Sequence, residues 1–257
     1  MSKGSASILA EAWDKSTAMS IWSNIGDVLS RMTTGAVSSL VEAVRSMLEG
    51  DPATRRRVAF SVAMIALSAK MAKADGIVTF DEMQAFQQIF HIPEGEERNV
   101  ARLFDLAKQD TAGFETYAGQ IEKLCGSGQD NCPALEDILD GLFHIAKADG
   151  AFHESELQFL ESTAVIFKLD ERHYQTILAR HGADGEADPY AVLGLKRGVG
   201  LDEARKVWRK LVQENHPDIL TGRGVPEEFI AIANERIKVI NRAWTRPASG
   251  RPSPCMP

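Results

Sequence analysis

The sequence predicts an all-α protein that consists of a helical bundle, a hinge and a C-terminal helical hairpin. Apolar residues recur every three or four positions along much of the chain, which is the spacing of a helix face. The segment at 72–76 recurs at 146–150, and short polar segments with Pro or Gly separate the helical stretches. The expected parts are a helical segment at 1–51, a helical domain with two pseudo-repeats at 52–181, a hinge at 182–187, a hairpin domain at 188–246 and a disordered tail at 247–257.

The composition is that of a globular protein, since 44% of the 257 residues are hydrophobic and 25% are charged. The formal net charge of -7 is distributed unevenly along the chain. Residues 1–187 hold 17 Lys and Arg against 28 Asp and Glu, whereas residues 188–246 hold 11 against 8. The basic C-terminal domain therefore favours an acidic protein surface as its partner, and we expect no nucleic-acid partner.

The sequence shows no sign of export or of membrane insertion. The first 20 residues lack a continuous apolar region. The longest apolar stretch, at 58–69, is shorter than the roughly 20 residues of a membrane span and predicts a buried core helix. Three cysteines occur without a CxxC pair, so neither a disulfide framework nor a zinc ribbon is indicated. We therefore expect no transmembrane segment and a cytoplasmic location, with peripheral membrane association left open.

An amphipathic helix is expected within residues 5–50. Its opposite face carries only Arg31 and Arg45 as clear cations, so the basic face of a membrane-surface helix is missing. Packing against the rest of the chain, or against a second copy in a homodimer, is the favoured interpretation. The apolar face comprises Ile21, Ile25, Val28, Leu29, Met32, Ala36, Leu40, Val44 and Met47.

The repeat at 52–181 predicts two helical hairpins. In each copy a helix precedes an Asp-Gly pair and another helix follows a glutamate, Glu82 in the first copy and Glu156 in the second. The glycines suit a left-handed position after a helix, and Thr79 with Glu82 has the spacing of a capping box.

A metal site is the alternative interpretation of these turns. Carboxylates from both copies have the chemistry to hold a hard divalent cation, although EF-hand spacing is absent. His144 and His153 flank the second turn as conceivable zinc ligands, but surface or helix-end histidines are the commoner explanation. We expect no cofactor, with a divalent cation as the alternative. The candidate ligands are Asp75, Asp81, Glu82, Asp149, Glu154 and Glu156.

The C-terminal domain is predicted to contain three helices. Asp188 before Pro189 indicates a helix start at 189–195. A second helix is expected at 201–213, a loop at 216–225, and a third helix from Pro226. The two long helices should form an antiparallel pair. The second helix carries a cationic strip beside its apolar face, formed by Arg205, Lys206, Arg209 and Lys210.

In order and spacing, the C-terminal domain resembles the J domain of DnaJ-family co-chaperones. The resemblance rests on DPYAVLGL at 188–195, WRKLV at 208–212 and His216-Pro217-Asp218. The segment that follows, at 218–228, is most similar to the DnaJ-like A subgroup, which also has a helical domain similar to the TerB tellurite-resistance proteins. Members of this subgroup usually begin with a membrane-spanning segment, which this sequence lacks.

The resemblance implies a co-chaperone that stimulates ATP hydrolysis by a DnaK-type heat-shock chaperone and so assists protein folding or a stress response. His216, Pro217, Asp218 and the cationic strip would contact that partner, and none of them would break bonds, so the protein itself would not be an enzyme. Ile219 stands where the family commonly has a lysine, which puts the affinity or choice of partner in doubt. The client proteins are not indicated.

Two other functions are compatible with the sequence. In the first, the repeat domain is a metal-binding or stress-sensing module and the J domain is its output. In the second, His216 and Asp218 are the acid and base of a hydrolase, which also requires a pocket and a nucleophile that the sequence does not indicate.

Overall fold

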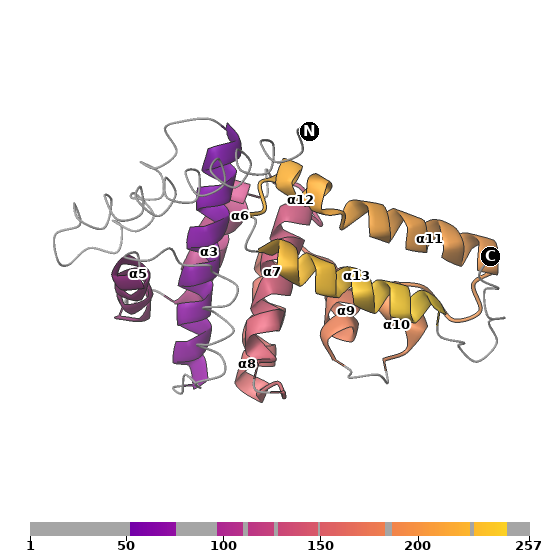
Figure 1. Ribbon diagram of the computed structural model, residues 1–257. Coiled ribbons are helices and arrows are strands. Elements are labelled where there is room, and N and C mark those ends of the chain that lie inside the picture. The colour runs from indigo at the N-terminus through magenta and orange to yellow at the C-terminus, as the bar shows by residue number, and fades with distance from the viewer. Residues whose placement is uncertain are drawn as a thin grey trace, which may run out of the picture.

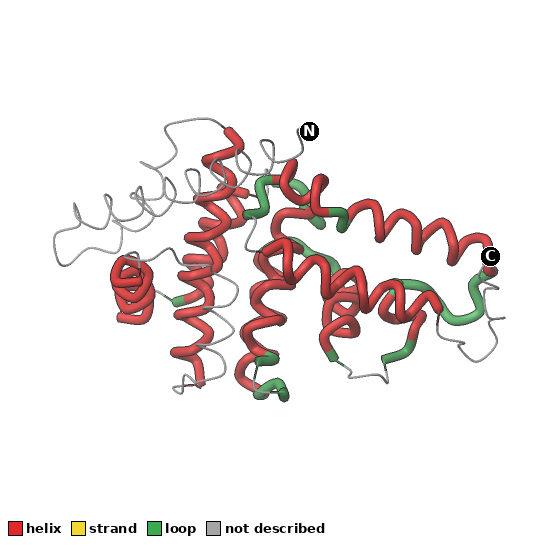
Figure 2. Tube along the Cα trace, in the orientation of Figure 1, coloured by secondary structure: helices red, strands yellow, loops and turns green. Residues whose placement is uncertain are grey.

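The computed structural model describes residues 52–75, 97–109, 113–125, 128–148, 150–182, 187–226 and 229–245. Helices and connecting turns make up these ranges, with no strand among them, which confirms the predicted all-α class (Figure 2). The amphipathic segment with its homodimer hypothesis, the first repeat turn, Asp149 and the tail from residue 246 lie outside the described residues.

The helices follow one another in an order that matches the predicted helical stretches (Figure 1). Helix α3 begins at Pro52, the first residue of the predicted helical domain. Helix α10 is preceded by Asp188, whose Oδ1 accepts a hydrogen bond from the Tyr190 amide at 3.1 Å. Their bounds are α3 Pro52–Asp75, α5 Glu97–Gln109, α6 Phe114–Cys125, α7 Pro133–Ala146, α8 Glu154–Ile166, α9 Glu171–His181, α10 Pro189–Val192, α11 Leu201–Glu214, α12 Pro217–Arg223 and α13 Ile230–Thr245.

Helix α3 is the central helix of the bundle. It contacts α5, α6, α7 and α8, and its residues 59–72 are buried on all sides. A helix that is apolar around its whole circumference has to be covered by neighbours in every direction, which confirms the core helix predicted at 58–69. Figure 1 shows α3 and α7 side by side.

The second repeat copy forms the predicted helix, turn and helix. Helix α7 ends at Ala146 and α8 begins at Glu154. Gly150 has a φ of 95°, the left-handed region that glycine adopts without a steric penalty. It lies three residues beyond the C-cap Lys147, so it shapes the turn and does not cap α7 directly.

Helices α11 and α13 lie side by side, as predicted for the hairpin (Figure 1). The Trp208 indole Nε1 donates to Asn241 Oδ1 at 2.8 Å, and its ring stacks on Trp244 with centroids 5.1 Å apart. Val192, Leu193 and Ile240 form a small apolar core with these helices. Helix α13 begins at Ile230, a few residues after the predicted start at Pro226.

The C-terminal hairpin packs against the bundle. Leu220, Val225 and Phe229 belong to the same apolar core as α3 and α7, and the Phe229 ring lies 4.7 Å from that of Phe60. Arg172 of α9 donates from Nη2 to the Gly194 carbonyl at 2.7 Å. The chain on the two sides of residues 183–186 is thus joined by packing and hydrogen bonds, and the hinge at 182–187 stays a prediction.

Candidate partner-binding site

The predicted motif lies at the start of helix α12. His216 is the N-cap residue, Pro217 is the first helical residue, and the His216 Nδ1 accepts a hydrogen bond from the Asp218 amide at 3.3 Å. Proline fits this position because the first turn of a helix does not use its amide proton. The side chains of His216 and Asp218 are 57% and 90% exposed, and a macromolecular partner can therefore reach both.

The prediction of a loop at 216–225 is wrong, because residues 217–223 form a helix. Three local features explain it: the histidine cap, the proline at the first position, and Gly224 at a φ of 89° as the left-handed C-cap. Leu220 turns into the core of the bundle, so the short helix is anchored by packing as well as by its caps.

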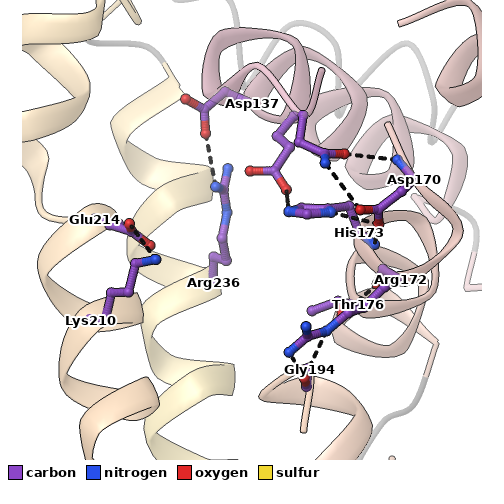
Figure 3. Close-up of polar contacts among 11 residues, drawn as sticks. Asp137, Asp170, Arg172, His173, Thr176, Gly194, Lys210, Glu214 and Arg236 are labelled. Atoms are coloured by element: carbon purple, nitrogen blue, oxygen red, sulfur yellow. Dashed lines mark hydrogen bonds and ion pairs between the residues drawn. The ribbon is translucent and has the colours of Figure 1, made fainter. Parts of the chain in front are cut away.

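The predicted cationic strip lies on helix α11, immediately before the motif. Lys206, Arg209 and Lys210 are exposed and Arg205 is half-buried. Lys210 Nζ lies 3.6 Å from Glu214 Oε1, one helical turn further along, which neutralises the end of the strip in part (Figure 3). The structure thus brings the cations and the motif onto two consecutive helices that contact each other.

Ile219 is one of the exposed residues of helix α12. Its exposed fraction of 43% is unusual for a large apolar side chain, and it follows Asp218 directly. The position at which the family commonly has a lysine therefore presents an apolar surface in this chain.

A buried group of charged residues behind the motif was not found by sequence reasoning. Arg236 of α13 donates from Nη1 to Asp137 Oδ1 and to Asn215 Oδ1, both at 2.8 Å, and its Nη2 lies 2.9 Å from Asp140 Oδ2. Figure 3 shows Arg236 pointing toward Asp137. The only signal in the sequence was a pair of aspartates, three positions apart, in an otherwise largely apolar helix.

The pKa values of the two aspartates of this group are shifted in opposite directions. Burial alone would raise the pKa of Asp140, but Arg236, His181 and Arg180 together outweigh burial and hold that pKa well below its usual range. Burial raises the pKa of Asp137 in spite of Arg236. Asp140 is therefore the more acidic of the two carboxyl groups, because it faces His181 as well as the arginine.

In the predicted metal site, the structure describes the side chains of Glu154 and Glu156, and both accept local hydrogen bonds. The buried Glu156 accepts a hydrogen bond through Oε2 from the His153 amide at 2.8 Å, which holds the start of helix α8. The exposed Glu154 accepts from Gln158 at 3.5 Å. The described residues include no group of His, Cys, Asp and Glu that could hold a metal ion. Metal binding stays a prediction for all six candidates, because the Asp75 side chain, Asp81, Glu82 and Asp149 lie outside what the structure describes.

The class of the helical bundle follows from a comparison with known families. Residues 61–179 match the family described as tellurite resistance protein TerB. This range runs from within α3 to within α9 and lies inside the predicted helical domain at 52–181. The bundle is therefore a TerB-type helical domain.

The similarity to individual proteins extends further along the chain. The co-chaperone protein DjlA of Photobacterium profundum is 29% identical over 215 residues, which cover 74% of this chain and 76% of that protein. DjlA of Coxiella burnetii is 27% identical over 68% of this chain and 71% of that protein, and DjlA of Legionella pneumophila is 23% identical over 72% and 75%. The chain is thus DjlA-like with a TerB domain, which confirms the predicted resemblance. No solved structure matches it.

The comparison corrects the expected cytoplasmic location. That expectation relied on the lack of a membrane-spanning segment in the sequence, whereas DjlA proteins are membrane-anchored co-chaperones. Within the ranges that the structure describes, no helix has the length and apolar character needed to cross a membrane.

Proposed function

We propose that this chain is a co-chaperone that binds a DnaK-type chaperone through helices α11 and α12 and stimulates its ATP hydrolysis. The names of the relatives support the co-chaperone role. The observation that carries the proposal is the exposure of His216 and Asp218 directly after the exposed cations of α11.

The chemistry of this surface suits docking and does not suit catalysis by the chain itself. Exposed cations steer an acidic partner into place and raise the rate of encounter. Asp218 then offers a carboxylate for a charge-assisted hydrogen bond, and the proline and the helix cap keep the turn in one shape. An exposed histidine and aspartate lack the water-excluded surroundings in which an acid–base pair works best. The bond that breaks is in the ATP of the partner.

The cationic strip is tested by charge reversal with a matched control. The test variant is Lys206→Glu with Arg209→Glu, and the control is Lys196→Glu with Arg242→Glu, which has the same charge change at exposed positions outside the strip. Single-turnover ATP hydrolysis by a cognate DnaK is measured against the concentration of each variant. We expect the test variant to need about tenfold more protein for half-maximal stimulation, because the introduced glutamates repel an acidic partner and slow the encounter.

Salt gives a second criterion for the same experiment. Exposed charges are screened within about 10 Å at 0.1 M salt and within about 3 Å at 1 M. The difference between the test variant and the control should therefore shrink as salt is added. Equal half-maximal concentrations for both variants at low salt would remove α11 from the docking surface.

A further inference from the structure

Three residues in or next to helix α12 connect it with the TerB-type bundle, directly or through Arg236. Leu220 inserts into the core that α3 and α7 form. Arg223, the last residue of α12, has its Nη1 3.8 Å from Asp137 Oδ2. Asn215, immediately before the helix, accepts a hydrogen bond from Arg236. Two of these three contacts are polar. Arg223 contacts Asp137 of α7 directly, and Asn215 is connected to Asp137 through Arg236.

Asn215 lies between helix α11, which carries the cationic strip, and the motif at the start of helix α12. It is 5% exposed, its Nδ2 donates to the Leu211 carbonyl at 2.7 Å, and its Oδ1 accepts from Arg236. The side chain of Asn215 thus joins the last turn of α11 to α13. The next residue in the chain is His216, so a shift of the Asn215 backbone would also move the histidine.

Arg236 can hold the Asn215 side chain in place because the guanidinium of Arg236 is itself held in place. Its side chain is 10% exposed, and three nitrogens of one planar guanidinium reach Asp137, Asp140 and Asn215. A planar group with several bound acceptors has almost no freedom to rotate. Buried ion pairs contribute little to stability compared with apolar packing, whereas they specify geometry well in some proteins. The apolar contacts of Leu220 and Phe229 would hold the hairpin on the bundle without this arginine.

We propose that Arg236 is a positioning residue for the partner-binding turn: clamped by Asp137 and Asp140 of the TerB-type bundle, it fixes Asn215 and thereby the orientation of His216 and Asp218 relative to α11. The functional part of this inference rests on the proposed stimulation of a DnaK-type chaperone. The TerB-type bundle would then hold the cationic strip of α11 and the motif of α12 in a fixed arrangement.

The test compares two arginines that both connect the bundle with the hairpin. Arg236→Lys keeps the positive charge beside the aspartates but places all its donors on one nitrogen, so it cannot reproduce the contacts that the three guanidinium nitrogens make. Arg180→Lys is the matched control, because Arg180 of α9 donates from Nε to the Val192 carbonyl of α10 at 3.3 Å and makes no contact with Asn215. Both variants are assayed in the full chain, well below their melting temperatures, for maximal stimulation and for half-maximal concentration.

We expect Arg236→Lys to lower maximal stimulation of single-turnover ATP hydrolysis roughly tenfold, the effect of one hydrogen bond to a charged group. Arg180→Lys should stimulate like the unaltered chain. Because Arg236 acts through Asn215, combining Arg236→Lys with Asn215→Ala should reduce stimulation no further than Asn215→Ala alone. Equal stimulation by the Arg236 and Arg180 variants, or additive losses in the double variant, would overturn the positioning role.

A measurement on the chain without a partner separates this inference from the proposed function. The amide of Asp218 donates to His216 Nδ1, so its nitrogen–proton NMR signal reports on the turn. We expect Arg236→Lys to move this signal and Arg180→Lys to leave it in place. If the unaltered chain stimulates no ATP hydrolysis, the proposed function fails. The NMR signal then decides the positioning alone, and an unmoved signal in Arg236→Lys overturns it.

Discussion

His144 lies on the part-buried side of helix α7, close to the same charged group. Burial lowers its pKa, and the nearby His181 and Lys147 lower it further, while Asp140 and Glu235 act in the opposite direction. Since the pKa in the folded chain is below the ordinary value of 6.5, the unfolded chain binds this proton more readily. The contribution of neutral His144 to stability is therefore complete above that value and is lost as the pH falls through the folded pKa.

The consequence is a pH dependence of stability that one substitution should reduce. We expect the free energy of unfolding to decrease as the pH is lowered from about 8 to about 5, the range in which histidines titrate. His144→Gln does not titrate and should make this decrease smaller. Urea denaturation at several pH values measures the effect, with His216→Gln at an exposed site as the control. An unchanged slope in His144→Gln would contradict the direction given for this pKa.

At the scale of elements, helix α12 has one glycine near its end and another directly after it, and the two have different backbone conformations. Gly222 lies within the helix, and a Cβ there would meet nothing within 4 Å. Gly224 ends the helix at a φ of 89°, which other residues adopt only with strain. The same substitution to alanine should therefore have opposite effects at positions two residues apart.

We expect Gly222→Ala to raise the free energy of unfolding by about 0.5 kcal/mol, because alanine loses less backbone entropy in a helix. Gly224→Ala should lower it by about 1 to 2 kcal/mol, because of the left-handed conformation. Urea denaturation of the two variants side by side is the measurement. A stabilising effect at Gly224 would mean that α12 does not end in this conformation.

The hairpin elements were predictable because their signals are local. Asp188 and Pro189 adjoin in sequence and together start α10. The apolar spacing of α11 and α13 predicted that these helices pair, and the structure shows Trp208 stacked on Trp244 between them. Helix α12 was interpreted as a loop because it is short and glycine-containing. Its Leu220 packs into a core that residues far away in the sequence provide, and this anchor cannot be seen in the local sequence.

At the scale of the whole molecule, the docking of the hairpin on the bundle was beyond the reach of the sequence. Arg236 and Asp137 are 99 positions apart, and charged residues are expected on the surface, so neither one indicates its buried partner. The motif itself was found because its residues are contiguous. The support behind it became visible only once the chain was folded, and this support links the TerB-type bundle to the exposed turn.

In this arrangement the proposed docking surface is exposed to solvent, while the opposite side of the same segment packs against the bundle. His216, Asp218 and most cations of α11 are exposed, whereas Leu220 and Asn215 are buried against the rest of the chain. A partner can therefore bind without first separating the hairpin from the bundle. The central claim is that the exposed turn is the part that stimulates the partner.

The most direct test is single-turnover ATP hydrolysis by a cognate DnaK in the presence of the unaltered chain or of His216→Gln. Circular dichroism should show equal helix content for both, because His216 is exposed and makes only a local cap. We expect the unaltered chain to accelerate hydrolysis and His216→Gln to leave it at the basal rate of the partner. Equal acceleration by both proteins would contradict the proposed role of the turn.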